Sequence, residues 1–225
     1  MKTIRTKAIV LRRTNYGEAD RVVQFITPDS GMVSVMAKGV RKEKSRLAGG
    51  IELFASCDIT VGSGKGELGI LTAARLHTFY GNIMTDYDHL QFGYEAIKQI
   101  SKASGLLDDP AFYELLEQTF ASLNDLEINL AYTKCWFWLQ LAIVMGVGLN
   151  LSTDTNGMKL VEDVRYSFSE ADTAFSFAEN GQYTSDHIKL LRILSAQSAR
   201  VAMHVKDGED LIHDCLWVAE RAVAH

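Results

Sequence analysis

The sequence is poor in proline and cysteine. Its 225 residues include two prolines, Pro28 and Pro110, which argues against a long disordered linker. Its three cysteines, Cys57, Cys135 and Cys215, are far apart and form no CxxC pair. This spacing supports neither a zinc ribbon nor a disulfide framework, and it predicts buried thiols in a reducing cytoplasm.

Long apolar segments are also missing. The longest apolar run, Cys135 to Leu149, has 15 residues, which is shorter than the ~20 that a membrane-spanning helix needs. We therefore expect a buried helix there and no membrane association. Near the N-terminus, the apolar run Ala8 to Leu11 is too short for the core of a signal peptide. A cytoplasmic protein is expected.

Charge is distributed unevenly along the chain. The net charge is -5, yet residues 1–80 carry 13 Lys/Arg against 7 Asp/Glu, whereas residues 81–225 carry 10 against 21. The two parts therefore have net charges of +6 and -11. Such asymmetry is typical of a polyanion-binding module joined to a second module.

The stretch from Ala37 to Gly50 concentrates this positive charge. Five basic residues and one acid lie between Lys38 and Arg46, bracketed by Gly39 and the pair Gly49-Gly50. Phosphates favour many weak Lys/Arg contacts, so the stretch suits a nucleic-acid backbone. The alternative is a solvated loop whose charge serves solubility.

The first 80 residues have the pattern of strands. Five short apolar runs are separated by turn-forming residues and show no helical period: Ala8–Leu11, Arg21–Thr27, Met32–Ala37, Asp58–Val61 and Leu68–Leu76. Five strands in this length indicate a small barrel. A five-stranded OB-fold is the leading prediction, and an SH3-like barrel fits the spacing nearly as well.

From about Tyr87 the apolar residues follow a helical period. Two short alternating runs, Val164–Phe168 and Ala174–Phe177, interrupt the helices and predict a small β insertion at about residues 150–183. The predicted class is therefore an α+β multidomain protein. Its expected domains are a barrel at residues 1–80 and a helical bundle at residues 81–225.

Motifs for catalysis are missing. The glycine-rich segment Gly62–Gly66 departs from the phosphate-binding pattern, because a glycine follows its lysine and a strand follows the loop, so a hairpin tip is predicted. The sequence contains no HExxH helix and no GxSxG elbow. We expect no enzyme and no cofactor.

Four segments resemble the bacterial RecO family of recombination mediators. They are Ala8–Arg21, Ala37–Lys42, Ser45–Gly49 and, more weakly, Leu71–Leu76. The resemblance implies an OB-fold on a helical domain that binds single- and double-stranded DNA and anneals complementary strands. It also implies that the protein, with the partner RecR, helps load RecA onto strands coated by single-stranded-DNA-binding protein. Bacterial cytoplasm and association with the nucleoid follow from the same resemblance.

Two features depart from the family pattern. Many relatives carry a four-cysteine zinc site in the β insertion, but Leu151 to Gly157 contains no cysteine. Zinc is therefore not expected, and the insertion should be held by packing around Phe168, Phe175 and Phe177. Relatives also place arginines at the start of the central helix to dock the acidic tail of the single-strand-binding protein. Here that stretch offers Lys134 as the candidate contact.

The expected DNA contacts all lie in the barrel. Those in the basic loop are Lys38, Arg41, Lys42, Lys44 and Arg46, and those flanking it are Arg12, Arg13 and Arg21. The acids of the segment Gly17–Arg21 would repel DNA, so we expect Glu18 or Asp20 to fix the turn and pair with a basic neighbour. The runner-up function is a protein–protein adaptor whose basic barrel docks an acidic partner.

Overall fold

The computed structural model describes residues 3–65, 68–107 and 109–223. Gly66, which belongs to the predicted hairpin tip, lies outside these residues. The chain divides into two compact units, residues 1–124 and 125–225. In the described part of the chain, no helix combines the length and apolar character that a bilayer crossing requires.

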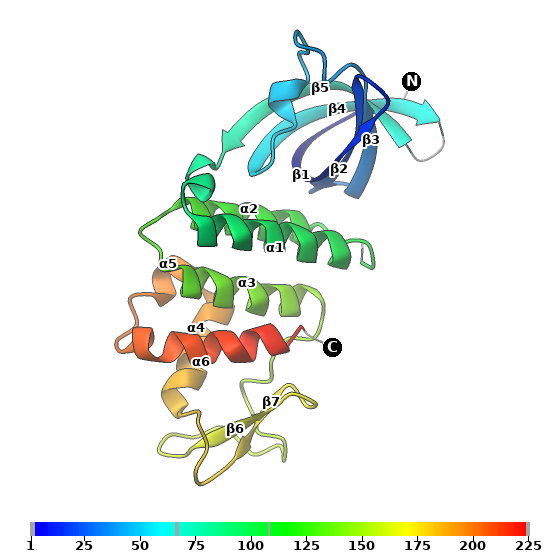
Figure 1. Cartoon of the computed structure of the whole chain (residues 1–225). Coiled ribbons are helices and arrows are strands. Elements are labelled where there is room, and N and C mark those ends of the chain that lie inside the picture. The colour runs from blue at the N-terminus through cyan, green and yellow to red at the C-terminus, as the bar shows by residue number, and fades with distance from the viewer. Residues whose placement is uncertain (1–2, 66–67, 108, 224–225) are drawn as a thin grey trace. The chain divides into compact units, whose positions relative to one another are not determined.

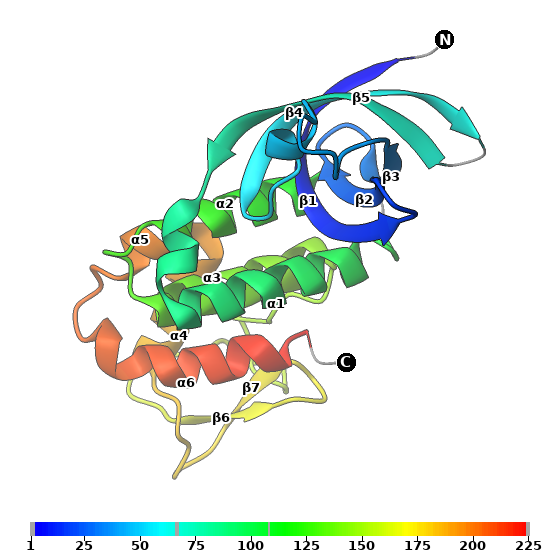
Figure 2. The same ribbon diagram turned by 45° about the horizontal axis from the view of Figure 1, so that its top comes forward.

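The first unit contains a closed five-stranded barrel in the order β1-β2-β3-β5-β4, seen from two directions in Figures 1 and 2. Its strands are β1 (Ile4–Tyr16), β2 (Asp20–Thr27), β3 (Gly31–Ala37), β4 (Ala55–Lys65) and β5 (Leu68–Phe79). All neighbours are antiparallel except β3 and β5, which run parallel at Val35↔Gly69 and Met36↔Ile70. This is the predicted OB-fold.

Alternation along the strands fills the barrel. Val10 of β1 lies opposite Phe25 of β2, and both are buried in the barrel core. Ile9 lies opposite Ile26 on the outer face, where both are also fully buried. The two helices of the first unit explain the second pair, because they pack against β1 and β2 from outside. The two helices therefore cover the outer face of the barrel where β1 and β2 carry Ile9 and Ile26.

These helices are α1 (Tyr87–Ala103) and α2 (Ala111–Asn124), preceded by the 3-10 turn η2 (Gly81–Thr85). Phe54, at the start of β4, joins them to the barrel: its ring lies edge-on to Tyr94 at 5.1 Å and to Phe120 at 5.5 Å. Gly93 of α1 allows this approach, since a Cβ there would come within 2.7 Å of the Phe54 ring. The predicted boundary at residue 80 coincides with the end of β5, whereas the compact units divide after Asn124. Whether residues 1–80 fold independently stays a prediction.

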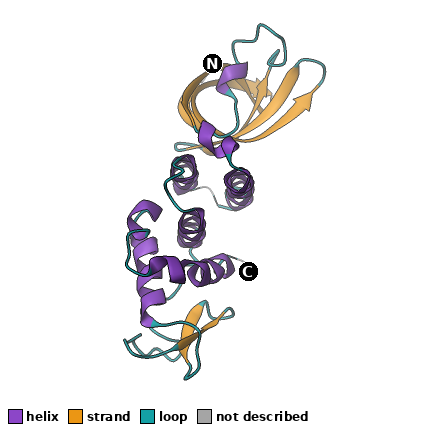
Figure 3. Ribbon diagram, turned by 60° about the vertical axis from the view of Figure 1, so that its left-hand side comes forward, coloured by secondary structure: helices purple, strands orange, loops and turns teal. Residues whose placement is uncertain are grey.

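The second unit is helical with a small sheet (Figure 3). It contains α3 (Leu130–Val144), β6 (Tyr166–Ser169), β7 (Ala174–Phe177), α4 (Ser185–Ala196), α5 (Ala199–Ala202) and α6 (Gly208–Arg221). Helix α3 is apolar on nearly all sides and packs against α4, α5 and α6, so the apolar run does contain a buried helix; the helix ends at Val144, however, and the predicted residues 145–149 lie beyond it. All three cysteines are free and buried. Burial, with a smaller contribution from Asp58, raises the pKa of Cys57 to about 12.

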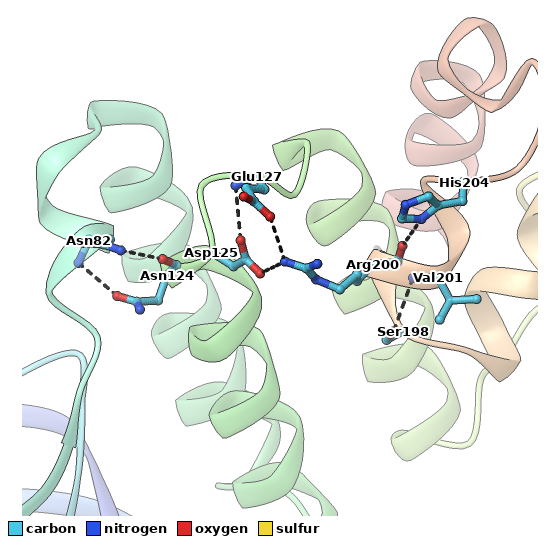
Figure 4. A network of polar contacts seen from close by, with 8 residues as sticks. All are labelled: Asn82, Asn124, Asp125, Glu127, Ser198, Arg200, Val201 and His204. Carbon is cyan, nitrogen blue, oxygen red and sulfur yellow. Dashed lines mark hydrogen bonds and ion pairs between the residues drawn. The ribbon is translucent and has the colours of Figure 1, made fainter.

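Hydrogen bonds fix each side of the junction between the two units (Figure 4). In the first unit, Asn82 donates two hydrogen bonds of 2.9 Å to Asn124, from its backbone N–H to the side-chain oxygen and from its side-chain amide to the backbone carbonyl. In the second unit, the guanidinium of Arg200 in α5 pairs with Asp125 and, at 3.3 Å, with Glu127. The Arg200 contact lowers the pKa of Asp125 below its ordinary value. Each unit thus has a defined end at residues 124–125.

The β insertion differs from the expectation in one residue. Phe168 and Phe175 are paired across β6 and β7, and Phe175 is fully buried among Tyr166, Phe168 and Tyr183. Phe177, expected in this core, is 60% exposed. Phe177 lies opposite Tyr166 in the pair farthest from the hairpin turn, and of these two residues on one face it is Tyr166, also bridged to Tyr183, that is buried.

Two matched substitutions test this aromatic core. Phe175→Ala should lower the free energy of unfolding by about 3–5 kcal/mol, because it leaves a cavity among packed rings. Phe177→Ala should change it by no more than about 0.5 kcal/mol, since that ring is mostly in solvent. Urea denaturation followed by tryptophan fluorescence measures both, and equal losses would contradict the assignment of Phe175 as the centre of the core.

Candidate nucleic-acid interface

The basic loop begins where β3 leaves the barrel. Ala37, the last residue of β3, is fully buried, and the next side chain, Lys38, is exposed. Gly39 follows with a φ of +65°, a conformation that glycine adopts without strain. The chain therefore turns sharply away from the sheet at the first basic residue.

Three hydrogen bonds attach the start of this loop to the turn between β1 and β2. The Asp20 carboxylate accepts the Gly39 N–H at 2.7 Å, and the Ala19 carbonyl accepts the Arg41 N–H at 2.9 Å. The Arg41 guanidinium also donates to the Gly17 carbonyl at 3.2 Å. Asp20 thus holds a backbone amide of the loop, where the sequence suggested a pairing with a basic side chain.

The remainder of the loop is fixed by its apolar residues and by a glycine. Val40 is buried in the barrel core, and Leu47 and Ala48 pack against it. The loop then enters the 3-10 turn η1 (Ala48–Gly50), where Gly50 lies against β5: a Cβ there would meet Ala74 at 2.5 Å. A Cβ at Gly49, by contrast, would have no other atom within 4 Å. Of the two bracketing glycines, Gly50 is therefore the one that close packing requires.

This framework leaves the five predicted cations of the loop in solvent: Lys38, Arg41, Lys42, Lys44 and Arg46. Within residues 3–65, 68–107 and 109–223, none of the five forms an ion pair. The loop also contains one acid, Glu43, which is exposed. The loop thus presents a local excess of positive charge that no acid of the described structure neutralises.

The three flanking arginines lie in different surroundings. Arg12 is opposite Gln24, and it is exposed. Arg13 is opposite Val23, whose side chain is in the barrel core, and its guanidinium pairs with Glu52 at 3.1 Å and donates to the Ile51 carbonyl at 3.2 Å. Arg13 therefore fixes the segment that contains Ile51 and Glu52, whereas Arg12 extends into solvent.

Arg21 is the third flanking arginine. Its Nε donates to the Asn15 side chain at 3.1 Å, across the β1–β2 pair. Lys134, the candidate contact for an acidic partner, is half-buried in α3 of the second unit. The loop cations and Arg21 are thus linked through one turn, whereas Lys134 belongs to another part of the protein. Their roles stay predictions.

Two features of the barrel surface were not anticipated from the sequence. Tyr16 is 59% exposed at the end of β1, next to Gly17. A groove of about 700 Å³ opens at the other end of β3, where the β4–β5 hairpin diverges from Gly31–Ser34. An aromatic residue directly before a turn glycine was a usable signal for Tyr16. The groove forms where strands diverge, and no local feature of the sequence indicates it.

Metal ligands do not converge in the described structure. Among residues 3–65, 68–107 and 109–223, no three His, Cys, Asp or Glu side chains come together in a way that could hold a metal ion. The expectation that the chain binds no zinc stays a prediction.

An OB-fold barrel with a basic loop, followed by a helical unit, is the class of protein that this architecture defines. Residues 1–80 match the family model described as "Recombination protein O N terminal". These residues are thus similar to the N-terminal domain of RecO proteins, in agreement with the family resemblance seen in the sequence.

Curated relatives bear the same family name. The chain is 32% identical over 146 residues to DNA repair protein RecO of Rubrobacter xylanophilus, covering 65% of this chain and 58% of that protein. It is 32% identical over 116 residues to DNA repair protein RecO of Thermobifida fusca, covering 52% of this chain and 48% of that protein. A third relative, from Bifidobacterium animalis subsp. lactis, is 38% identical over 87 residues, 39% of this chain and 36% of that protein. The chain thus spans about half the length of the curated relatives it matches.

Asp20→Ala tests the attachment of the loop. Removing the carboxylate leaves the Gly39 N–H without its acceptor, so the free energy of unfolding should fall by about 1 kcal/mol, with a lower melting temperature. The neighbouring exposed acid provides the control: Glu18→Ala removes the same charge and should leave stability within about 0.5 kcal/mol. Equal melting temperatures for the two variants would contradict the structural role of Asp20.

The metal content of the purified protein is a separate prediction. Structural zinc needs four Cys or His ligands held closely together, and the β insertion lacks cysteine. Elemental analysis should therefore find substoichiometric zinc, and a chelator should leave the melting temperature unchanged. Stoichiometric zinc, with a loss of stability on chelation that added zinc restores, would contradict this expectation.

Proposed function

We propose that the barrel binds single- and double-stranded DNA through its basic loop, and that the protein acts in DNA repair and recombination without bond chemistry of its own. The single observation that carries this proposal is the set of five exposed loop cations that form no ion pair within the described residues. A phosphate backbone would supply the missing negative charge, and release of its counterions would drive binding.

The attachment of the loop supports this proposal. A cationic loop that serves only solubility gains nothing from a fixed position, whereas a binding surface loses less entropy on binding when its charges are already in place. Here Asp20 and the carbonyl groups of Gly17 and Ala19 fix the start of the loop, and Val40 and Leu47 anchor it to the barrel. The charges are thus presented on a pre-formed surface.

We further propose that the protein anneals complementary strands and, with RecR, helps load RecA onto strands coated by single-stranded-DNA-binding protein. A family resemblance of the barrel, together with relatives named as DNA repair proteins, supports this role. The charge division supports confinement of DNA to the barrel, because residues 81–225 carry a net charge of -11 and would repel a polyanion. Lys134 remains the proposed contact for the acidic tail of the single-strand-binding protein, and the bacterial nucleoid is the proposed location.

Salt dependence tests the loop directly. If five loop cations neutralise phosphates of a single strand, log Kd should change with log[salt] with a slope of magnitude about 3.5. Replacing Lys38, Lys42, Lys44 and Arg46 by Ala, with Arg41 kept for the structure of the loop, should reduce that magnitude to about 0.7. Fluorescence anisotropy with a labelled oligothymidylate, titrated at several salt concentrations, measures both slopes.

The control removes cations of the same unit outside the loop. Lys98 and Lys102 are exposed on α1, and their replacement by Ala should leave the slope unchanged. Wild-type protein that binds no DNA at physiological salt would overturn the proposed function and favour the adaptor that docks an acidic protein. Binding with an unchanged slope in the loop variant would place the DNA site elsewhere.

A further inference from the structure

Tyr16 is an exposed aromatic residue beside the basic loop, and among residues 3–65, 68–107 and 109–223 no hydrogen bond, ion pair or ring contact of its side chain explains its position. The barrel strands carry three aromatic residues, Tyr16, Phe25 and Phe79. Phe25 is fully buried in the core, whereas Tyr16 and Phe79 are 59% and 46% exposed. Phe79 lies at the far end of β5, with its ring against Gly81. Tyr16 alone lies at the turn to which the loop is attached.

Strand register places Tyr16 on the outer face of the barrel. Residues directly opposite in an antiparallel pair share a face, and Tyr16 is opposite Asp20. One step further along β2 and β3, Arg21 is opposite Ala37. Lys38 is exposed because the preceding side chain, Ala37, points into the core. Tyr16 and Asp20 therefore lie opposite each other, and Lys38 follows directly after the pair Arg21↔Ala37, where β3 ends and the loop begins.

This arrangement brings an aromatic ring close to the cations. Adjacent strands are ~4.8 Å apart, and β2 alone separates β1 from the end of β3, where the loop begins. Arg41 comes closer still, since its guanidinium donates to the carbonyl of Gly17, the residue after Tyr16. The Asp20 carboxylate is directed at the Gly39 N–H, and among the described residues it forms no ion pair with a loop cation.

The backbone that carries the ring is also held in place. Pairing of β1 with β2 extends to Tyr16 itself, and Gly17 makes the turn with a φ of +57°. The three hydrogen bonds from the loop to Gly17, Ala19 and Asp20 fix the other side of the turn. A tyrosine ring on a fixed backbone has few rotatable bonds left to order when a ligand stacks on it.

We propose that Tyr16 is a base-stacking residue that gives the barrel its preference for single-stranded over double-stranded DNA. Every base has a π-face that an exposed ring can cover, and a cationic groove beside such a ring is a common arrangement for binding single strands. In a duplex the base faces are already stacked on one another, so the loop cations reach the phosphates but the ring gains nothing. This inference rests on the proposed binding of DNA by the basic loop.

The test compares full-length variants on two probes, a fluorescein-labelled oligothymidylate and a blunt duplex of the same length. Tyr16→Ala should weaken single-strand binding by about 5- to 100-fold and duplex binding by less than about twofold, because only the single strand offers free base faces. The salt slope should stay at the wild-type value, since no charge is removed. Tyr16→Phe should bind both probes as the wild type does.

Phe79→Ala is the matched control, because it removes an exposed aromatic ring from the same barrel away from the loop. Tyr16→Leu keeps apolar bulk in the strand and removes the π-face, so it repeats the test if the alanine variant is unstable. Tyr16→Trp adds a reporter to residues 1–80, where tryptophan is otherwise missing. Its fluorescence should be quenched by the oligothymidylate, in excess of any change in the wild type, and not by the duplex.

The outcomes separate the two proposals. Equal losses on both probes, or no loss on either in Tyr16→Ala, would overturn the stacking role while the loop remains a DNA site. Wild-type protein that binds neither probe would overturn the proposed function and this inference together.

Discussion

Closure of the barrel by β1 is the constraint on which the rest of the first unit depends. Its first half, Ile4–Ile9, pairs with β4, and its second half, Ile9–Tyr16, pairs with β2. An irregularity between Val10 and Arg12 allows the strand to serve both neighbours. The barrel then has no open edge along β1 that could pair with another chain.

This closure determines where positive charge can be presented. Because β2 begins where β1 ends and β3 ends beside the start of β2, the turn at Gly17 and the loop at Lys38 must lie side by side. Three hydrogen bonds then hold the start of the loop to the turn. Of the two acids of the turn, Asp20 has a structural use in this arrangement, because its carboxylate accepts the Gly39 N–H.

The second unit obtains its stability from apolar and aromatic packing. Helix α3 is buried on nearly all sides, and the β insertion packs Phe175 among three other rings. Ring edges against ring faces contribute beyond the area they bury. In an insertion with only two four-residue strands, this core supplies cohesion that hydrogen bonds between so few residues could not.

Local pattern by itself determined much of this protein. Alternating apolar residues and turn chemistry identified all five barrel strands, because strand period and turn residues are local properties of the chain. The cluster from Lys38 to Arg46 was visible as charge, and the buried α3 as an apolar run. Tertiary packing was not visible: it buried Tyr166 and left Phe177, which lies opposite on the same face, exposed, and it directed Arg13 to Glu52 while Arg12 stays exposed. Only the tertiary structure brought Asp20 to Gly39 and Tyr16 beside the basic loop, because residues 19 or more positions apart meet only after the strands have paired.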